Sequence, residues 1–276
     1  MVKKVDMREA WNKISNSYQT RYEIKTEKIH YGPLCPSEDQ LNLLGNVKGK
    51  FILELGSGAA QNSIYLSKNG AITTAVDISD EQLNHGKILA EKERVKVSLI
   101  RSSFSQFKSR FNDNSFDIVL SVYALQYCTS VKELKKVIKD IYLVLKDNGM
   151  FIFSLDHPIR HRGYWDDSRD SFTLDNYFDR DNKVWKYSFP ENNTSAEMSG
   201  VFFTLEDYIS AVIYAGFFIK KFIEPEPIKT DSNSKFGYNS RYGAVNIKDP
   251  YSYNHLSRIP GTLIIKGVKL AKNSNI

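Results

Sequence analysis

An acidic residue, a glycine turn and a second acidic residue form the pattern in this chain that is most suited to binding a ligand. Glu54 stands just before the turn Gly56-Ser57-Gly58, and Asp77 follows 19 residues after Gly58. Glycines let the main chain bend sharply and let a ligand approach without a Cβ in between. An acidic residue about 20 residues beyond such a turn is the ribose partner in nucleoside-binding folds. The pattern therefore indicates a nucleoside site.

Two departures from the dinucleotide pattern indicate which nucleoside is bound. Gln61 stands where a third glycine would be needed. A carboxylate at Glu54 disfavours a pyrophosphate and suits a cationic, amino-bearing ligand. S-adenosylmethionine has an adenosine for Asp77 and a positively charged amino-acid end, so it fits both features. A nicotinamide dehydrogenase is disfavoured for the same two reasons.

The elements that must position these residues alternate between strands and helices. Short apolar runs predict buried strands, and segments with helical spacing between them begin at capping residues and end at glycines such as Gly70. The predicted caps include Ser79, Thr204 and Ser37, and Ser37 precedes a helix expected from Glu38 to Gly45. Ligands bind at the carboxyl ends of such strands, where the strand order reverses. The expected strands cover residues 51–53, 71–76, 95–100, 116–121, 150–155, 217–223 and 262–270.

Four motifs in the correct order are similar to the class I S-adenosylmethionine-dependent methyltransferases, in the small-molecule, type 11-like branch. They are ELGSGAA, AVDIS, SFDIVLSVYALQY and LKDNGMFIFS, and the similarity covers roughly residues 45–156. The resemblance implies an α/β fold with a doubly wound, mostly parallel sheet. It also implies an N-terminal helical lid, a cap insertion after the fifth strand, and S-adenosyl-L-methionine as cofactor.

This resemblance predicts a division of the chain into four parts. Residues 1–45 form a helical arm or lid, with a helix over 4–28, and residues 46–157 form the cofactor-binding core. Residues 158–203 are the cap insertion, in which 184–189 is expected to pair with 198–204 as a hairpin over the sheet. Residues 204–276 complete the core and include a long acceptor-side loop over 229–260.

The cofactor site is predicted from the strand ends, the lid aromatics and the resemblance. Ile78 is expected under the adenine, and Ser103 occupies the position where the family often has an acidic residue for the adenine amino group. The predicted cofactor-binding residues are Tyr18, Tyr22, Tyr31, Glu54, Gly56, Ser57, Gly58, Asn62, Asp77, Ile78, Gln82, Ser103, Phe104, Ser121, Val122 and Tyr127.

The methyl acceptor is expected beside the cofactor, under aromatic side chains. His157 ends the fifth strand and is the best candidate for a general base, although it could instead orient the loop. The predicted acceptor-binding residues are Tyr18, Gln126, Trp165, Tyr177 and His255. No metal site is predicted, because the two cysteines, Cys35 and Cys128, have no metal-ligand spacing.

Composition limits the partners. The chain has 276 residues and a net charge of +6, but its basic residues are scattered and form no track for nucleic acid. No apolar run approaches the roughly 20 residues of a membrane helix, and the N-terminus lacks the apolar centre of a signal peptide. We therefore expect a cytoplasmic enzyme, monomer or homodimer, that methylates a small molecule at oxygen or nitrogen. A tRNA or protein methyltransferase of the same fold, and a non-catalytic S-adenosylmethionine-binding protein, stay open as alternatives.

Overall fold

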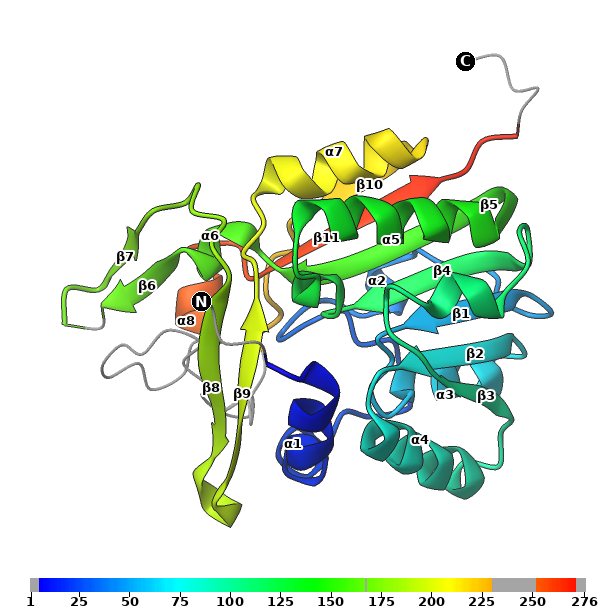
Figure 1. Ribbon diagram of the computed structural model, residues 1–276, viewed down its shortest axis with the longest axis horizontal. Helices are drawn as coiled ribbons and strands as arrows, with labels where there is room; N and C mark the ends of the chain where they lie inside the picture. The colour runs from blue at the N-terminus through cyan, green and yellow to red at the C-terminus, as the bar shows by residue number, and fades with distance from the viewer. Residues whose placement is uncertain (1–4, 167, 230–251, 272–276) are drawn as a thin grey trace.

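The computed structural model describes residues 5–166, 168–229 and 252–271. One mixed sheet forms its centre (Figure 1). Its strands are β1 (Phe51–Leu55), β2 (Ile72–Asp77), β3 (Val97–Arg101), β4 (Phe116–Val122), β5 (Leu145–Asp156), β10 (Phe218–Ile223) and β11 (Thr262–Val268).

The strand order is β10-β11-β5-β4-β1-β2-β3. Strands β1 to β5 pair in parallel, whereas β11 is antiparallel to both β5 and β10. The order reverses between β1 and β4, which is where a doubly wound sheet binds its ligand. The predicted α/β, doubly wound and mostly parallel sheet is therefore confirmed.

Helices cover both faces of this sheet. The helices of the described residues are α1 (Met7–Tyr22), α2 (Glu38–Leu41), α3 (Gln61–Lys68), α4 (Asp80–Lys92), α5 (Val131–Val144), α6 (Pro158–His161), α7 (Leu205–Ala215) and α8 (Tyr253–Leu256), with 3₁₀ turns η1 (Phe107–Arg110), η2 (Leu125–Tyr127) and η3 (Pro190–Asn192). The predicted caps at Ser79 and Thr204 are confirmed, since each hydroxyl accepts a bond from a first-turn backbone N–H. None of the helices in the described residues has the length and apolar character needed to cross a membrane.

Two helix predictions near the N-terminus were too long. The helix expected over 4–28 ends at Tyr22, because Glu23 adopts a left-handed conformation with φ of 42°. The helix expected from Glu38 to Gly45 is a single turn that ends at Leu41, because Asn42 is also left-handed. Asparagine tolerates this conformation better than most residues, so it can stop a helix as glycine does.

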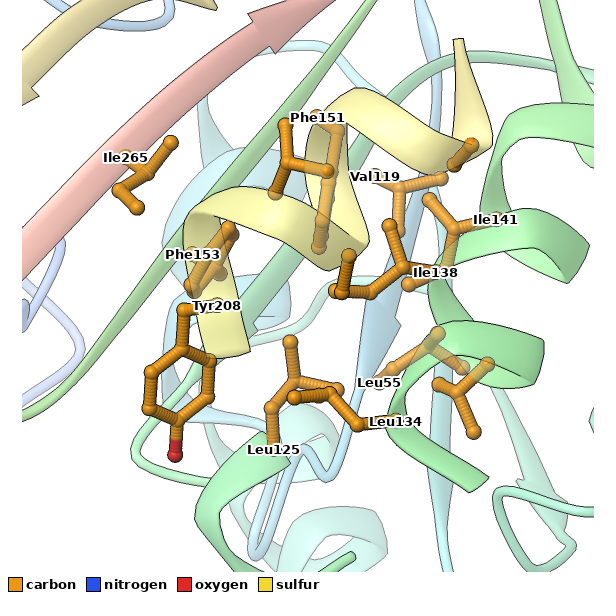
Figure 2. Packing of buried hydrophobic residues seen from close by; sticks show 14 of the residues in the cluster. Leu55, Val119, Leu125, Leu134, Ile138, Ile141, Phe151, Phe153, Tyr208 and Ile265 are labelled. Carbon is orange, nitrogen blue, oxygen red and sulfur yellow. The ribbon is translucent and has the colours of Figure 1, made fainter. Parts of the chain in front are cut away.

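Alternation along each strand divides the core into two faces. Val119, Phe151 and Phe153 point to the face covered by α5 and α7, where Leu134 and Tyr208 meet them (Figure 2). The intervening residues of the same strands pack on the other face, among side chains that precede β1 or belong to α3. This period of two is the one expected for strands buried on both faces.

Two hairpins lie between β5 and α7. The first is β6 (Gly163–Asp166) with β7 (Ser171–Leu174), and the second is β8 (Lys183–Phe189) with β9 (Thr194–Gly200). The predicted pairing partner of 184–189 was therefore shifted along the chain. The segment after Gly200 is not part of the hairpin, because Phe203 is buried in the main core and Thr204 caps α7.

The second hairpin packs on α1, which corrects its expected position over the sheet. Ile14 of α1 is buried in a cluster with Trp185 and Phe189 of β8 and with Met198 of β9. Figure 1 shows α1 between this hairpin and α4. The N-terminal helix and the β8–β9 hairpin thus share one small hydrophobic core.

Candidate functional site

The turn between β1 and α3 can be built only from small residues. Gly56 has a φ of +70° and Gly58 a φ of +54°, which is the left-handed region. A Cβ on Gly56 would overlap the Cβ of Ala124, which follows β4. A Cβ on Gly58 would meet only the Gln82 side chain, at 3.8 Å. The first glycine is therefore required by packing, and the second leaves space beside the backbone.

Asp77 is held at the end of β2 by the backbone of this turn. Its carboxylate accepts hydrogen bonds from the Gly58 N–H at 2.8 Å and from the Ser79 N–H at 2.9 Å. Burial nevertheless raises the pKa of Asp77 to about 6. The carboxylate is thus fixed in position, but it is protonated more easily than an exposed one.

Glu54 is directed at the start of α3. It accepts hydrogen bonds from Asn62 Nδ2 at 3.0 Å, from the Ser63 N–H at 3.0 Å and from the Ser63 hydroxyl at 2.6 Å. Burial raises its pKa to about 7, against the effect of these donors. An ionised carboxylate has about four acceptor positions, so room for one more donor is left.

A cavity of about 300 Å³ opens at the carboxyl ends of β1, β2 and β4. Most of the predicted cofactor-binding residues line it, although they come from segments far apart in the sequence. Those on its wall are Tyr18, Tyr22, Glu54, Gly56, Ser57, Gly58, Asn62, Asp77, Ile78, Gln82, Ser103, Phe104, Val122 and Tyr127.

Tyr31 and Ser121 are the predicted cofactor residues that lie outside the cavity wall. The Tyr31 ring is buried under the sheet, and its hydroxyl donates to Glu38 at 2.6 Å. The Ser121 hydroxyl is buried and donates to the Leu55 carbonyl at 3.0 Å, which ties β4 to β1. Both side chains support the edge at which the ligand would bind.

Helix α1 closes one side of the cavity through polar contacts that the sequence reasoning did not include. Gln19 donates to Gln82 and accepts from Gln61, each at 2.7 Å. Near the start of the helix, Arg8 donates to Asp80 at 2.8 Å and Asn12 accepts from the Ser79 hydroxyl. Gln61, which distinguishes this turn from a dinucleotide site, thus also connects the turn to α1.

Aromatic rings cover the part of the cavity on the β4 side. Trp11 lies 5.6 Å from the Tyr127 ring, edge to face. The hydroxyls of Tyr22 and Tyr187 are 2.9 Å apart and join α1 to β8 across the cover. Trp11 and Tyr187 were not predicted; the helical spacing of Trp11 with Tyr18 and Tyr22 was the available signal for the first.

Of the predicted acceptor-side residues, Tyr18 and Gln126 line the cavity, and the others do not. His157 is buried, with Nε2 2.8 Å from Glu224 and with Nδ1 accepting from the Ile159 N–H. Because Nδ1 accepts, the proton of the neutral ring is on Nε2, which donates to Glu224. Both ring nitrogens are thus used in holding the loop, and this arrangement offers no support for the expected general base. His30, in contrast, lies on the wall, and burial lowers its pKa to about 4.

Two of the remaining acceptor candidates, Trp165 and Tyr177, belong to the cap, and His255 lies in α8. Trp165 stacks on His255 with ring centroids 4.4 Å apart. The Tyr177 hydroxyl accepts from the Leu205 N–H at 2.9 Å, at the start of α7. These contacts fasten the first hairpin to α8, and the segment after the hairpin to α7. Part of the predicted acceptor-side loop, residues 230–251, lies outside the described residues.

A doubly wound sheet with a glycine turn after β1 and an acid at the end of β2 defines a nucleoside-binding α/β protein. The family described as Methyltransferase domain matches residues 53–153. The chain is also 31% identical over 196 residues to the uncharacterized methyltransferase YbaJ of Bacillus subtilis, covering 64% of this chain and 69% of that protein. The chain belongs to the S-adenosylmethionine-dependent methyltransferases, and S-adenosylmethionine is its cofactor.

Two further similarities concern the fold and the range of acceptors. An S-adenosylmethionine-dependent methyltransferase structure from Mesorhizobium loti superposes with a TM-score of 0.59 at 20% identity, covering 83% of this chain and 95% of that one. A ubiquinone biosynthesis O-methyltransferase of Coxiella burnetii is 28% identical over 117 residues. That match covers 42% of this chain and 46% of the relative.

Proposed function

We propose that this protein methylates a small molecule at an oxygen or nitrogen atom. The observation that carries the proposal is the wall of the cavity. Aromatic rings from α1, η2 and β8 line it, and none of the described residues on it is Lys or Arg. A nucleic-acid acceptor would require basic side chains for its phosphates. The name of the Coxiella relative, which acts in ubiquinone biosynthesis, agrees with a small acceptor.

The residues around the glycine turn suit each part of the donor. Asp77 is placed to accept from ribose hydroxyls, and the open backbone at Gly58 allows the nucleoside to approach. Ile78 and Phe104 offer apolar surface for the adenine. Glu54 retains one acceptor position for the ammonium group of the amino-acid end.

Bound S-adenosylmethionine supplies an already activated methyl group, so the protein has mainly to align the acceptor and exclude water. The aromatic cover made by Trp11, Tyr22, Tyr127 and Tyr187 serves both purposes, because its rings line the cavity and the Tyr22–Tyr187 hydrogen bond joins α1 to β8 across it. If the acceptor is already a good nucleophile, the transfer therefore requires no strong acid or base on the described wall of the cavity.

Calorimetric binding of S-adenosylhomocysteine tests the donor site. Asp77→Ala should weaken binding at least tenfold, because it removes the carboxylate that accepts hydrogen bonds from the ribose hydroxyls. The matched control is Asp113→Ala, whose exposed carboxylate contacts Lys108 away from the cavity. Equal affinities for the two variants would contradict the assignment of the site.

The acceptor class has its own test. The protein is incubated with donor labelled in the methyl group and with either a small-molecule extract or bulk tRNA. Label should enter the small-molecule fraction only, and filter binding of tRNA at two salt concentrations should show no salt-sensitive complex. Label in tRNA would refute the proposal, and donor that binds but is never consumed would favour a non-catalytic binding protein.

A further inference from the structure

One buried amide on the cavity wall has half of its hydrogen-bonding capacity unused. Gln126 lies in η2, directly after β4, and only 4% of it is exposed. Its Oε1 accepts a hydrogen bond from the Asp156 N–H at 3.1 Å. Its Nε2 has no hydrogen-bond partner among the described residues, although it carries two protons to donate. A buried donor without a partner costs free energy unless a ligand satisfies it.

The orientation of this amide is determined by its neighbour. The group of Asp156 that meets this amide is its backbone N–H, which can only donate, so the carbonyl oxygen of the Gln126 side chain must face it. Exchanging the oxygen and nitrogen would set an N–H group against an N–H group. The NH₂ group is therefore the part of the side chain that is left without a partner, and a ligand atom that meets it must be a hydrogen-bond acceptor.

The position of Gln126 assigns it to the methyl acceptor rather than to the donor nucleoside. Its partner Asp156 ends β5, and β5 and β4 lie on one side of β1, whereas the ribose-binding Asp77 ends β2 on the other side. The next residue, Tyr127, belongs to the aromatic cover and stacks on Trp185 at 6.3 Å between centroids. Gln126 thus lies where the cavity is covered by aromatic rings.

Charge on the wall limits what kind of atom Gln126 receives. The described wall has the carboxylates of Glu54, Asp77 and Glu133, and no Lys or Arg. The Glu133 carboxylate is already bonded to Thr129, at 2.7 Å to its N–H and 2.6 Å to its hydroxyl. An anionic acceptor would have no Lys or Arg partner on the described wall and would meet these carboxylates instead, which is unfavourable in a buried site.

We propose that Gln126 is a specificity-determining residue, and that the methyl acceptor is an uncharged ring compound with a carbonyl or phenolic oxygen that accepts a hydrogen bond from its Nε2. This inference rests on the proposed small-molecule methyl transfer and adds the chemical class of the acceptor. The ring packs among the aromatic side chains of the cover, and its oxygen accepts the hydrogen bond that the Gln126 amide has left to donate.

The test uses three probes of one shape on the protein saturated with S-adenosylhomocysteine. They are 2-acetylnaphthalene, whose ketone accepts a hydrogen bond, 2-isopropenylnaphthalene, which lacks the oxygen, and 2-naphthoate, which is an anion. Calorimetry should show the ketone binding about tenfold or more tightly than either of the others. No binding of the ketone, or equal binding of all three probes, would overturn the inference.

Two variants then assign the preference to Gln126. Gln126→Glu keeps an oxygen for the Asp156 N–H but replaces the donor by an acceptor, so ketone binding should fall below that of the hydrocarbon. Gln126→Leu should bind ketone and hydrocarbon equally. A preference for the ketone that survives in both variants would show that another group recognises the oxygen. Binding of S-adenosylhomocysteine is measured first for each protein. If the wild type does not bind it, the result contradicts the proposed function and not the role of Gln126.

Discussion

Replacing Gly56 by alanine tests whether close packing of two loops shapes the donor site. An alanine there must adopt a φ of +70°, which costs about 1–2 kcal/mol for an L-residue. Its Cβ would also overlap the Ala124 Cβ, and overpacking of this kind costs about 1–3 kcal/mol more. We therefore expect Gly56→Ala to lower the free energy of unfolding by about 2–5 kcal/mol and to displace β1 from the loop after β4.

Gly58→Ala is the matched control, because it carries the left-handed strain without the overlap. Its Cβ would have a single neighbour, the Gln82 side chain at 3.8 Å, so its stability cost should be about 1–2 kcal/mol. The companion change Ala124→Gly removes the atom that Gly56→Ala would strike. In a double-mutant cycle, Gly56→Ala and Ala124→Gly should therefore show a favourable coupling of about 1–3 kcal/mol.

Urea denaturation gives these stabilities, and calorimetry with S-adenosylhomocysteine gives the binding. Gly56→Ala should weaken binding strongly, and the double variant with Ala124→Gly should recover part of the lost affinity. Gly58→Ala should bind weakly while remaining well folded, because its added methyl group occupies the space of the ligand. If Gly56→Ala and Gly58→Ala are equally stable and Ala124→Gly rescues neither, the packing argument is wrong.

Further predictions concern pH, the buried histidine and the lid. Since burial raises the pKa of Asp77 to about 6, its ionised fraction falls from roughly 90% at pH 7 to roughly 10% at pH 5. Affinity for methylthioadenosine, which has the ribose but no amino-acid end, should fall about tenfold over that range; a flat profile would exclude Asp77 as the ribose ligand. His157→Ala should lower the thermal unfolding temperature and leave turnover per folded molecule nearly unchanged, whereas a large loss of turnover would restore His157 as the general base. Arg8→Ala should speed dissociation of S-adenosylhomocysteine, measured by stopped flow against Arg169→Ala, whose exposed ion pair is remote from α1.

The order of elements in the core was predictable because local signals agreed with the fold. The strand that ends at Asp77, the cap at Ser79 and the helix after it each carry their own sequence signature, and the structure has them within a few residues. Element ends were less accurate where the stop is a left-handed residue other than glycine, such as Glu23 or Asn42. Those conformations are selected by tertiary contacts, which local propensity does not contain.

The walls of the cavity were predictable where a motif, or the aromatic stripe of α1, marked them. Glu54 and Asp77 belong to the family pattern, so their positions followed from spacing. Gln19 and Tyr187 reach the cavity because α1 and β8 fold over it, and no local period indicates which side chains meet there. His157 illustrates the opposite case: the end of a strand suggested chemistry, but the structure gives both ring nitrogens hydrogen-bond partners, Glu224 on one side and the Ile159 N–H on the other.

Helix α1, the predicted lid, is attached unequally on its two sides, and this predicts where it would open. Towards the β8–β9 hairpin, α1 buries Ala10 and Ile14 in a shared apolar cluster. Towards α4 it makes polar contacts such as Arg8 with Asp80, whose side chains are 42% and 38% exposed. Exposed ion pairs contribute about 0–1 kcal/mol each, whereas a fully buried aliphatic side chain contributes about 1.5–3 kcal/mol. Admission of the donor should therefore separate α1 from α4 while α1 stays on the hairpin, so that the aromatic cover over the acceptor moves as one piece with the lid over the cofactor.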